Sequence, residues 1–247
     1  MIEILVVIVI IAILGALSYP AYTNIVRVAH ESNNVHNLRQ ITNGTLLWAA
    51  DHGDKLPSPL YSGTEPDLPT YWKLKTDGQE GLWLNGVIYA QLYLEDDASP
   101  DVDLGGNLQE ASAGGHLIGT VFQSEISNFG EERNFFKHSF AMNANLMYDQ
   151  LAILRDLENP WYSEKSLSKF VPTSAMIYID CAEPNVVMAE DIGAIRDTSK
   201  IRYDGKRVTV AYLDGHVKKT DIDEIPDRDV EADREASLFW RGVMPDR

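Results

Sequence analysis

The stretch MIEILVVIVIIAILGALSYPAY, residues 1–22 of a 247-residue chain, decides how the rest of the sequence is interpreted. It contains no polar side chain between Ile4 and Leu17, and no charged one between Ile4 and Tyr22. A helix over residues 4–22 would be about 28 Å long, close to the thickness of the hydrocarbon core of a bilayer. We therefore expect a helix of membrane-spanning composition that is headed by a single acid, Glu3.

The helical pattern continues beyond this stretch but changes character. Polar residues appear after Pro20, and six apolar residues recur among them at helical spacing: Ile25, Val28, Val35, Leu38, Ile41 and Trp48. We predict one helix over about residues 2–51, with an apolar half in 1–22 and an amphipathic half in 23–53. The segment 51–54 and the prolines at 57 and 59 end it.

Pro20 lies inside the predicted helix. A proline there removes one backbone hydrogen bond, so we expect a bend in the helix axis or a point of local melting. The alternative is a proline that a membrane helix simply tolerates.

The charge is distributed unevenly. The formal net charge is −16, yet residues 1–50 carry two acids and two bases, so the excess of acid lies in the remainder of the chain. An acidic body argues against a nucleic-acid partner, because phosphate binding needs a basic surface. A single cysteine, Cys181, excludes an intrachain disulfide, and its apolar surroundings predict a buried thiol.

The body, residues 54–247, carries strand signals near its C-terminal end. SAMIYID, residues 174–180, predicts a strand, and KRVTVAYLDGHVKKT predicts a hairpin over 208–219 with Asp214 and Gly215 as a two-residue turn. Leu238, Phe239 and Trp240 are expected to dock a short C-terminal helix on the body. The predicted fold class is α+β, a long N-terminal helix packed on an antiparallel sheet.

Three interpretations of the opening segment compete. A secretory signal would need a basic start and a small-residue cleavage site, and neither is present before Arg27. An ordinary membrane anchor fits the length but leaves Glu3 unexplained. A helix that is stored in the bilayer and later packs against copies of itself would use Glu3 to neutralise a neighbour's α-amine and set the register. An acid at mid-membrane costs about 2.5–3.5 kcal/mol or more, and less near the edge or when paired.

The residues on which the third interpretation rests resemble those of a known family. IEILVVIVIIAILGALSYPAY is similar to the N-terminus of type IV pilins and type II secretion pseudopilins, whose mature chains begin Phe-Thr-Leu-Ile-Glu. Glu3 falls on the family's glutamate and Pro20 on its helix-bending proline. The continuation NNVHNLRQITNGTLLWAADHGDKLP looks like that of large pilin-like proteins. RYDGKRVTVAYLDGHV resembles their C-terminal signature, with Asp214, Gly215 and His216 at its turn.

The resemblance implies a fold, a function and partners. It implies a pilin-like subunit that is inserted in the inner membrane with a periplasmic body and is then assembled into a type IV pilus or a secretion pseudopilus. The implied partners are copies of itself or related subunits, the inner-membrane assembly machinery, and the prepilin peptidase that cuts and methylates the N-terminus. Subunit assembly would depend on Glu3.

Two departures from the family pattern bear on these expectations. The family carries a basic leader that ends in Gly before the mature Phe, and this chain begins two residues after that cut. We expect a misassigned start codon, which in-frame translation of the upstream DNA would test. The signature His falls on Tyr203 or Asp204, so a function that needs this His is not implied.

The sequence favours no catalytic chemistry. It has no G-x-S-x-G, Walker, H-E-x-x-H or C-x-x-C motif. Some pseudopilins bind calcium near the C-terminus, and Asp221, Asp223 and Asp227 are the candidate ligands here, although charge runs are usually solvated. We expect no cofactor other than that possible calcium ion. The alternative function is a membrane-tethered periplasmic binding domain or enzyme, in which the helix serves only as an anchor.

Overall fold

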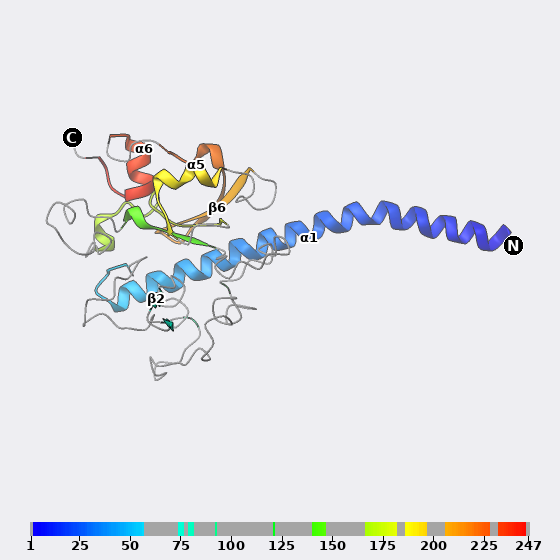
Figure 1. Ribbon diagram of the computed structural model, residues 1–247, viewed down its shortest axis with the longest axis horizontal. Helices are drawn as coiled ribbons and strands as arrows, with labels where there is room; N and C mark the ends of the chain where they lie inside the picture. The colour runs from blue at the N-terminus through cyan, green and yellow to red at the C-terminus, as the bar shows by residue number, and fades with distance from the viewer. Residues whose placement is uncertain are drawn as a thin grey trace.

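The long N-terminal helix dominates the computed structural model, which describes residues 2–56, 74–76, 79–81, 92, 121, 140–146, 166–181, 186–196, 206–227 and 232–245. Helix α1 spans Ile2–Asp51 as 50 continuous residues, as the sequence predicts. Gly53 and Asp54 adopt left-handed φ angles of 69° and 60°. The Asp54 amide donates to the Ala49 carbonyl at 2.8 Å, which caps the helix end. One half of α1 lies in the body, and the other half projects from it (Figure 1).

A five-stranded sheet forms the centre of the described body. Its order is β5-β3-β4-β6-β7, with bounds Val186–Val187, Ala141–Asn143, Met176–Ile179, Arg207–Tyr212 and Val217–Asp221. The four strands from β3 to β7 in this order pair antiparallel, as predicted, whereas β5 pairs parallel to β3. Strands β1, Leu74–Thr76, and β2, Gln79–Gly81, form a separate antiparallel pair.

Helices cover both faces of this sheet. Helix α1 lies along one face, and on the other lie α5 (Ile192–Ile195), α6 (Arg234–Ala236) and the π-helical turn η6 (Ser237–Arg241), as Figure 1 shows. The core is therefore divided in two by the sheet. The α1 side includes Leu38, Ile41, Leu56, Phe140, Leu146, Ile177, Tyr178 and Ala211. The other side includes Met176, Ile179, Val187, Ile192, Ile195, Val208, Val210, Phe239 and Trp240.

The predicted hairpin is present, but its loop is longer than expected. Ala211 pairs with Val217, and the Tyr212 amide donates to the His216 carbonyl at 3.0 Å. The loop is therefore Leu213–Gly215, three residues and not the predicted two. Gly215 has φ +86° and its amide donates to the Tyr212 carbonyl at 2.9 Å, which is a turn followed by a left-handed glycine.

The C-terminal segment closes the second core as predicted. Phe239 and Trp240 are buried, and the Trp240 indole donates to the Pro226 carbonyl. The buried Asn143 amide donates to the carbonyls of Met176 and Trp240, both at 2.8 Å, which ties two strands to η6. Cys181 is buried, as predicted, and as the single cysteine of the chain it forms no intrachain disulfide.

Candidate functional site

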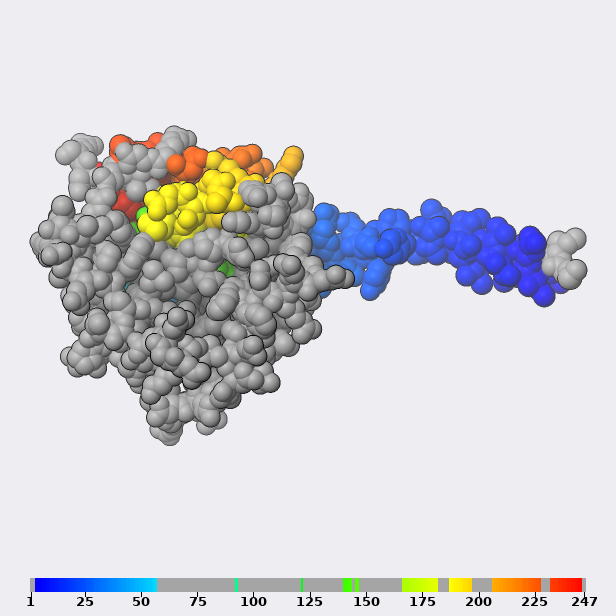
Figure 2. Space-filling model, viewed as in Figure 1, coloured from blue at the N-terminus to red at the C-terminus, as the bar shows by residue number. Residues whose placement is uncertain are grey.

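The projecting half of α1 is the candidate functional site. By length and composition α1 can cross a membrane, and its most apolar 18-residue window has a mean hydropathy of 2.7 with none of it buried. Figure 2 shows this half as a bare rod that extends from the body. Its large apolar side chains are about half to two-thirds exposed: Ile4, Leu5, Val6, Val7, Ile8, Val9, Ile10, Ile11, Ile13, Leu14 and Leu17.

Such a surface is unstable in water. A fully buried Val, Leu or Ile side chain gains about 1.5–3 kcal/mol relative to an exposed one. Summed over the run from Ile4 to Leu17, removal from water is worth on the order of tens of kcal/mol. The segment therefore requires a cover of lipid or of other protein chains, because the described body leaves it exposed.

Glu3 lies in the first turn of α1, at the end of the helix farthest from the body (Figure 1). An acid in the first turn is favoured by the positive end of the helix dipole. The side chain is exposed and lies directly before the apolar run. It is therefore accessible to a group on a second molecule.

Pro20 lies within α1, which continues through it without a break. Because proline has no N–H, the Ala16 carbonyl receives no amide hydrogen bond from position 20. Two hydroxyl groups bond to nearby backbone: Ser18 Oγ donates to the Leu14 carbonyl at 2.7 Å, and Thr23 Oγ1 to the Pro20 carbonyl at 3.0 Å. The projecting part of α1 is bowed in Figure 1.

The first buried residue of α1 is Glu31, which is later than the predicted amphipathic pattern places it. Ile25 and Val28 are 67% and 54% exposed, so the described part of the body does not cover them. The buried side of α1 instead includes four polar residues among its apolar ones: Glu31, Asn34, Thr42 and Thr45. This half of the helix is held to the sheet by polar contacts as well as by apolar packing.

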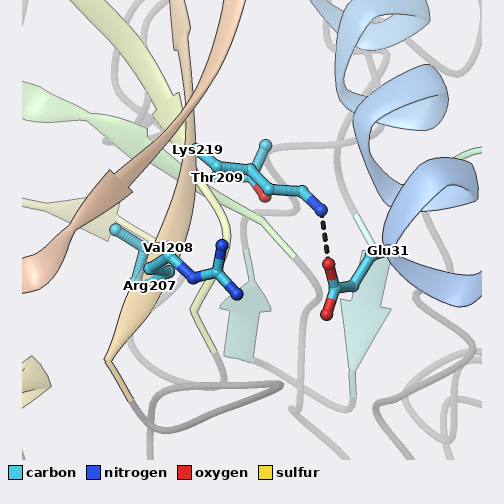
Figure 3. Close-up of a pocket in the computed structure, with 5 residues that line it drawn as sticks. All are labelled: Glu31, Arg207, Val208, Thr209 and Lys219. Atoms are coloured by element: carbon cyan, nitrogen blue, oxygen red, sulfur yellow. Dashed lines mark hydrogen bonds and ion pairs between the residues drawn. The ribbon is translucent and has the colours of Figure 1, made fainter. Parts of the chain in front are cut away.

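Polar pairs join α1 to the sheet and to the residue that follows β4. The Lys219 ammonium on β7 donates to the Glu31 carboxylate across a shallow pocket that Arg207, Val208 and Thr209 also line (Figure 3). Asn34 Nδ2 donates to Asp180 Oδ2 at 3.0 Å, and both side chains are buried. The hydroxyls of Thr45 and Tyr178 lie 2.8 Å apart. These pairs fix the direction in which α1 leaves the body.

The turn formed by Asp214, Gly215 and His216 lies at the opposite end of this contact from the projecting half. A Cβ on Gly215 would lie 3.3 Å from Asn43 Oδ1, so the turn sits beside the last part of α1. The His216 ring stacks on Tyr212 with centroids 4.1 Å apart. The Asp214 carboxylate accepts from the His216 amide at 3.1 Å.

The pKa of Asp214 reflects this local bonding. Partial burial acts to raise it, but the hydrogen bonds from the His216 backbone and ring outweigh burial and hold the pKa below its ordinary value. The geometry is that of a bonded hairpin turn. Tyr203 and Asp204, the other residues of the sequence signature, lie outside the described residues.

The three candidate metal ligands make other contacts, and two of them share one arginine. Asp221 caps the short helix η5, Ile222–Glu224, by accepting from the Asp223 amide at 3.0 Å. Asp227 forms an ion pair with the Arg196 guanidinium, and Asp223 Oδ1 lies 3.7 Å from Arg196 Nε. Within the described part of the chain, no three His, Cys, Asp or Glu side chains are grouped to hold a metal ion.

The polar side of α1 is the feature that the sequence interpretation missed. Residues 31, 34, 38, 41 and 45 recur at helical spacing, so the sequence contains the pattern of this buried side, but the pattern mixes polar and apolar side chains.

Comparison with protein-family models, curated proteins and solved structures gave no match.

Proposed function

We propose that this protein is a pilin-like structural subunit. Its α1 helix is held in the inner membrane with the acidic body on the periplasmic side, and the protein is then assembled into a type IV pilus or a secretion pseudopilus. The observation that carries this proposal is that the exposed apolar half of α1 continues, as one helix, into a half that packs against the folded body. A tether alone does not require that continuity, whereas a filament needs each body fixed relative to its helix.

In this proposal the run from Ile4 to Leu17 is covered twice. Lipid tails cover it in the membrane, and neighbouring helices cover it in the filament. Because its exposure to water costs on the order of tens of kcal/mol, the subunit passes directly from lipid to filament. The step requires no chemistry at the body.

Glu3 supplies the specific contact in this assembly. Its carboxylate at the tip of α1 pairs with the α-amine of an adjoining subunit, in a helix bundle of low dielectric constant where such a pair is strong. Apolar packing alone would permit two helices to align in many registers. One acid in an otherwise uniform apolar surface favours the single register in which it meets its partner. Its role is thus to fix register.

The test separates assembly from membrane insertion. Glu3→Gln removes the charge with almost no change of shape, and we expect it to abolish filaments while alkaline extraction still leaves the chain in the membrane. Glu190→Gln, an exposed acid on the body, is the matched control and should assemble normally. Normal filaments from Glu3→Gln would contradict the proposed role of Glu3.

A second exchange distinguishes a filament subunit from a tethered domain. Replacement of residues 1–22 by an unrelated transmembrane helix should keep the chain in the membrane and eliminate its function. A chain that retains full function after this exchange uses the helix only as an anchor, and the filament proposal would then be abandoned.

A further inference from the structure

The β6–β7 hairpin is basic, although the chain as a whole is strongly acidic. Residues 206–219 carry four bases and one acid, out of 21 bases and 37 acids in the chain. The other residues therefore carry 17 bases and 36 acids, a net charge of −19, against +3 for this segment. The hairpin thus suits an anionic partner, which the rest of the chain would repel.

The sheet register places one end of this hairpin toward the projecting half of α1. Gly215 lies beside Asn43, and Lys219 pairs with Glu31, which is twelve residues earlier in α1. Strand β7 therefore runs back along α1 toward its projecting half. The last residues of β7, and the residues of β6 that pair with them, lie closest to that half.

Two exposed cations lie at this end of the sheet. Arg207 pairs with Asp221, the last residue of β7, and the Lys206 carbonyl accepts from the Ile222 amide at 2.8 Å. Arg207 lies on the face of the sheet that α1 covers. Its guanidinium and the Lys219 ammonium extend into the same shallow pocket (Figure 3).

Arg27 on α1 faces the same end of the sheet. It precedes Glu31 by four residues, about one helical turn, and therefore lies on the same side of the helix. Its guanidinium donates to Asn24 Oδ1 at 2.9 Å, so the side chain points toward the membrane segment. We define the basic rim as Arg27, Lys206, Arg207 and Lys219. Together with the neighbouring acids Glu31 and Asp221, the rim carries a net charge of +2.

The acids that follow β7 lie toward the other face of the sheet. Helix η5 packs there through the buried Ile222, and both Asp223 and Asp227 contact Arg196, which follows α5. The cations of the rim that line the pocket lie on the α1 side instead. A membrane surface around α1 is therefore nearer to these cations than to those acids.

The rim is within reach of the headgroups when the apolar run fills a bilayer. Residues 2–21 form about 30 Å of helix, which spans a hydrocarbon core. Arg27 and Glu31 then lie about 9 and 15 Å beyond the hydrocarbon, where the headgroup layer is about 5–7 Å thick. Arg207 lies up to about 7 Å closer to the membrane than Thr209, which lines the pocket beside Glu31. Long arginine and lysine side chains cover the few ångströms that remain.

Protection of an edge strand explains only part of this charge. Lysines on an edge strand prevent its pairing with another sheet, and Lys218 and Lys219 on β7 fit that role. Arg207 does not fit it, because β6 is an inner strand between β4 and β7. Arg27 does not fit it either, because it lies on the helix. What the two arginines share is a position next to the membrane segment.

We infer that the basic rim binds the anionic lipid headgroups of the membrane in which α1 is inserted. The inference rests on the membrane-inserted state of the proposed function and adds a second membrane contact, made by the body. A cation is attracted to an anionic surface over roughly 8–10 Å in physiological salt, whether or not it also has a partner within the protein. The contact would hold the body against the membrane while α1 is in the lipid.

The test measures how close the rim comes to the headgroups. The full chain is reconstituted at one copy per nanodisc, which excludes contact with a second copy. The lipid is phosphatidylcholine, alone or with a roughly equal part of phosphatidylglycerol, and a trace of it carries a nitroxide on the headgroup, which speeds the relaxation of nearby methyl protons. Val208 reports on the rim, Val28 on insertion of α1, and Val217 on the far end of β7.

We expect Val208 to relax several times faster when phosphatidylglycerol is present, with little change at Val28 and Val217. About 0.5 M NaCl should remove the difference, because salt screens the attraction. Arg207→Gln should reduce it, and so should Arg27→Gln, which leaves the sheet untouched in case the first variant does not fold. Lys218→Gln removes the same charge from the opposite face of β7 and is the matched control, which should retain the difference.

Equal relaxation of Val208 in the two lipids, with Val28 relaxed in both, would overturn the inference and leave the proposed function standing. A difference that survives both arginine substitutions would also overturn it, because other residues would then cause the attraction. If Val28 is not relaxed in either lipid, α1 is not inserted, and the inference and the proposed function are both contradicted.

Discussion

Glu31 on α1 and Lys219 on β7 form an ion pair although 188 positions separate them in the sequence. The carboxylate is almost buried, with 9% of its side chain exposed, whereas 35% of the Lys219 side chain is exposed. The pair includes the first buried residue of α1. It therefore joins the projecting helix to the edge strand of the body.

Lys219→Ala should destabilise the body, because it leaves the Glu31 carboxylate buried without this cation. The expected loss is about 1–3 kcal/mol in the free energy of unfolding. Thermal unfolding of the full chain in detergent micelles, followed by near-ultraviolet circular dichroism, measures it. Lys218→Ala, the exposed neighbour, is the control and should change stability by less than about 0.5 kcal/mol. Equal losses of stability from the two substitutions would contradict a stabilising role of the ion pair between Glu31 and Lys219.

Alanine substitutions at three glycines should lower stability to different extents. Gly242→Ala should destabilise most, because its φ is +65° and a Cβ would lie 2.8 Å from Phe170 Cδ1 and from Ala175 Cβ. Gly215→Ala should cost less, about 1 kcal/mol or more, since its φ is +86° but, of the described residues, only Asn43 lies near the added Cβ, with Oδ1 at 3.3 Å. Gly193→Ala in α5 should be neutral or stabilising, because no atom of the described residues lies within 4 Å of the added Cβ.

Thermal unfolding of the three glycine variants in the same micelles gives their order directly. A Gly193→Ala variant less stable than Gly242→Ala would contradict the close packing of η6 against Phe170.

Some of the features behind these predictions can be predicted from the sequence, and others depend on contacts between distant segments. The extent of α1 follows from composition and spacing, and the hairpin follows from its alternating strand and Asp-Gly turn. The burial of both faces of β6 does not follow, because η6 and α1 arrive from distant parts of the chain. The polar pairs of α1 have the same origin, since Asp180 and Lys219 are identified as partners only by the fold.

The buried tyrosines predict how stability depends on alkaline pH. Burial raises the pKa of Tyr178 well above its ordinary value, against a smaller lowering by its hydrogen bond to Thr45. Burial likewise raises the pKa of Tyr212. An unfolded tyrosine ionises near pH 10, so the folded state holds protons that the unfolded state has lost. Stability is thus full below about pH 10 and falls as the pH rises toward the folded pKa values.

Urea titrations of the full chain in micelles at pH 8, 10 and 11 measure this loss. Tyr178→Phe should lower stability at pH 8 by about 1 kcal/mol, because the hydroxyl contact with Thr45 is lost, yet weaken the alkaline decline. If the free energy of unfolding falls equally with pH in Tyr178→Phe and in the wild type, groups other than Tyr178 cause the loss.

Pro20→Ala tests what the proline does to the projecting helix. Alanine supplies the amide that the Ala16 carbonyl lacks and removes the steric constraint of the ring, so the helix should be stabilised locally, by up to about 3 kcal/mol in helix propensity. Hydrogen exchange of the amides of residues 17–24 in micelles should slow in the variant. Ala21→Ser, a neighbouring change that leaves the backbone bonds intact, is the control. Filament assembly distinguishes the two roles of the proline. If it is only a tolerated membrane residue, the Pro20→Ala variant should form filaments normally. If assembly uses the bend, the variant should insert in the membrane and yet form fewer filaments, although its helix is the more stable one.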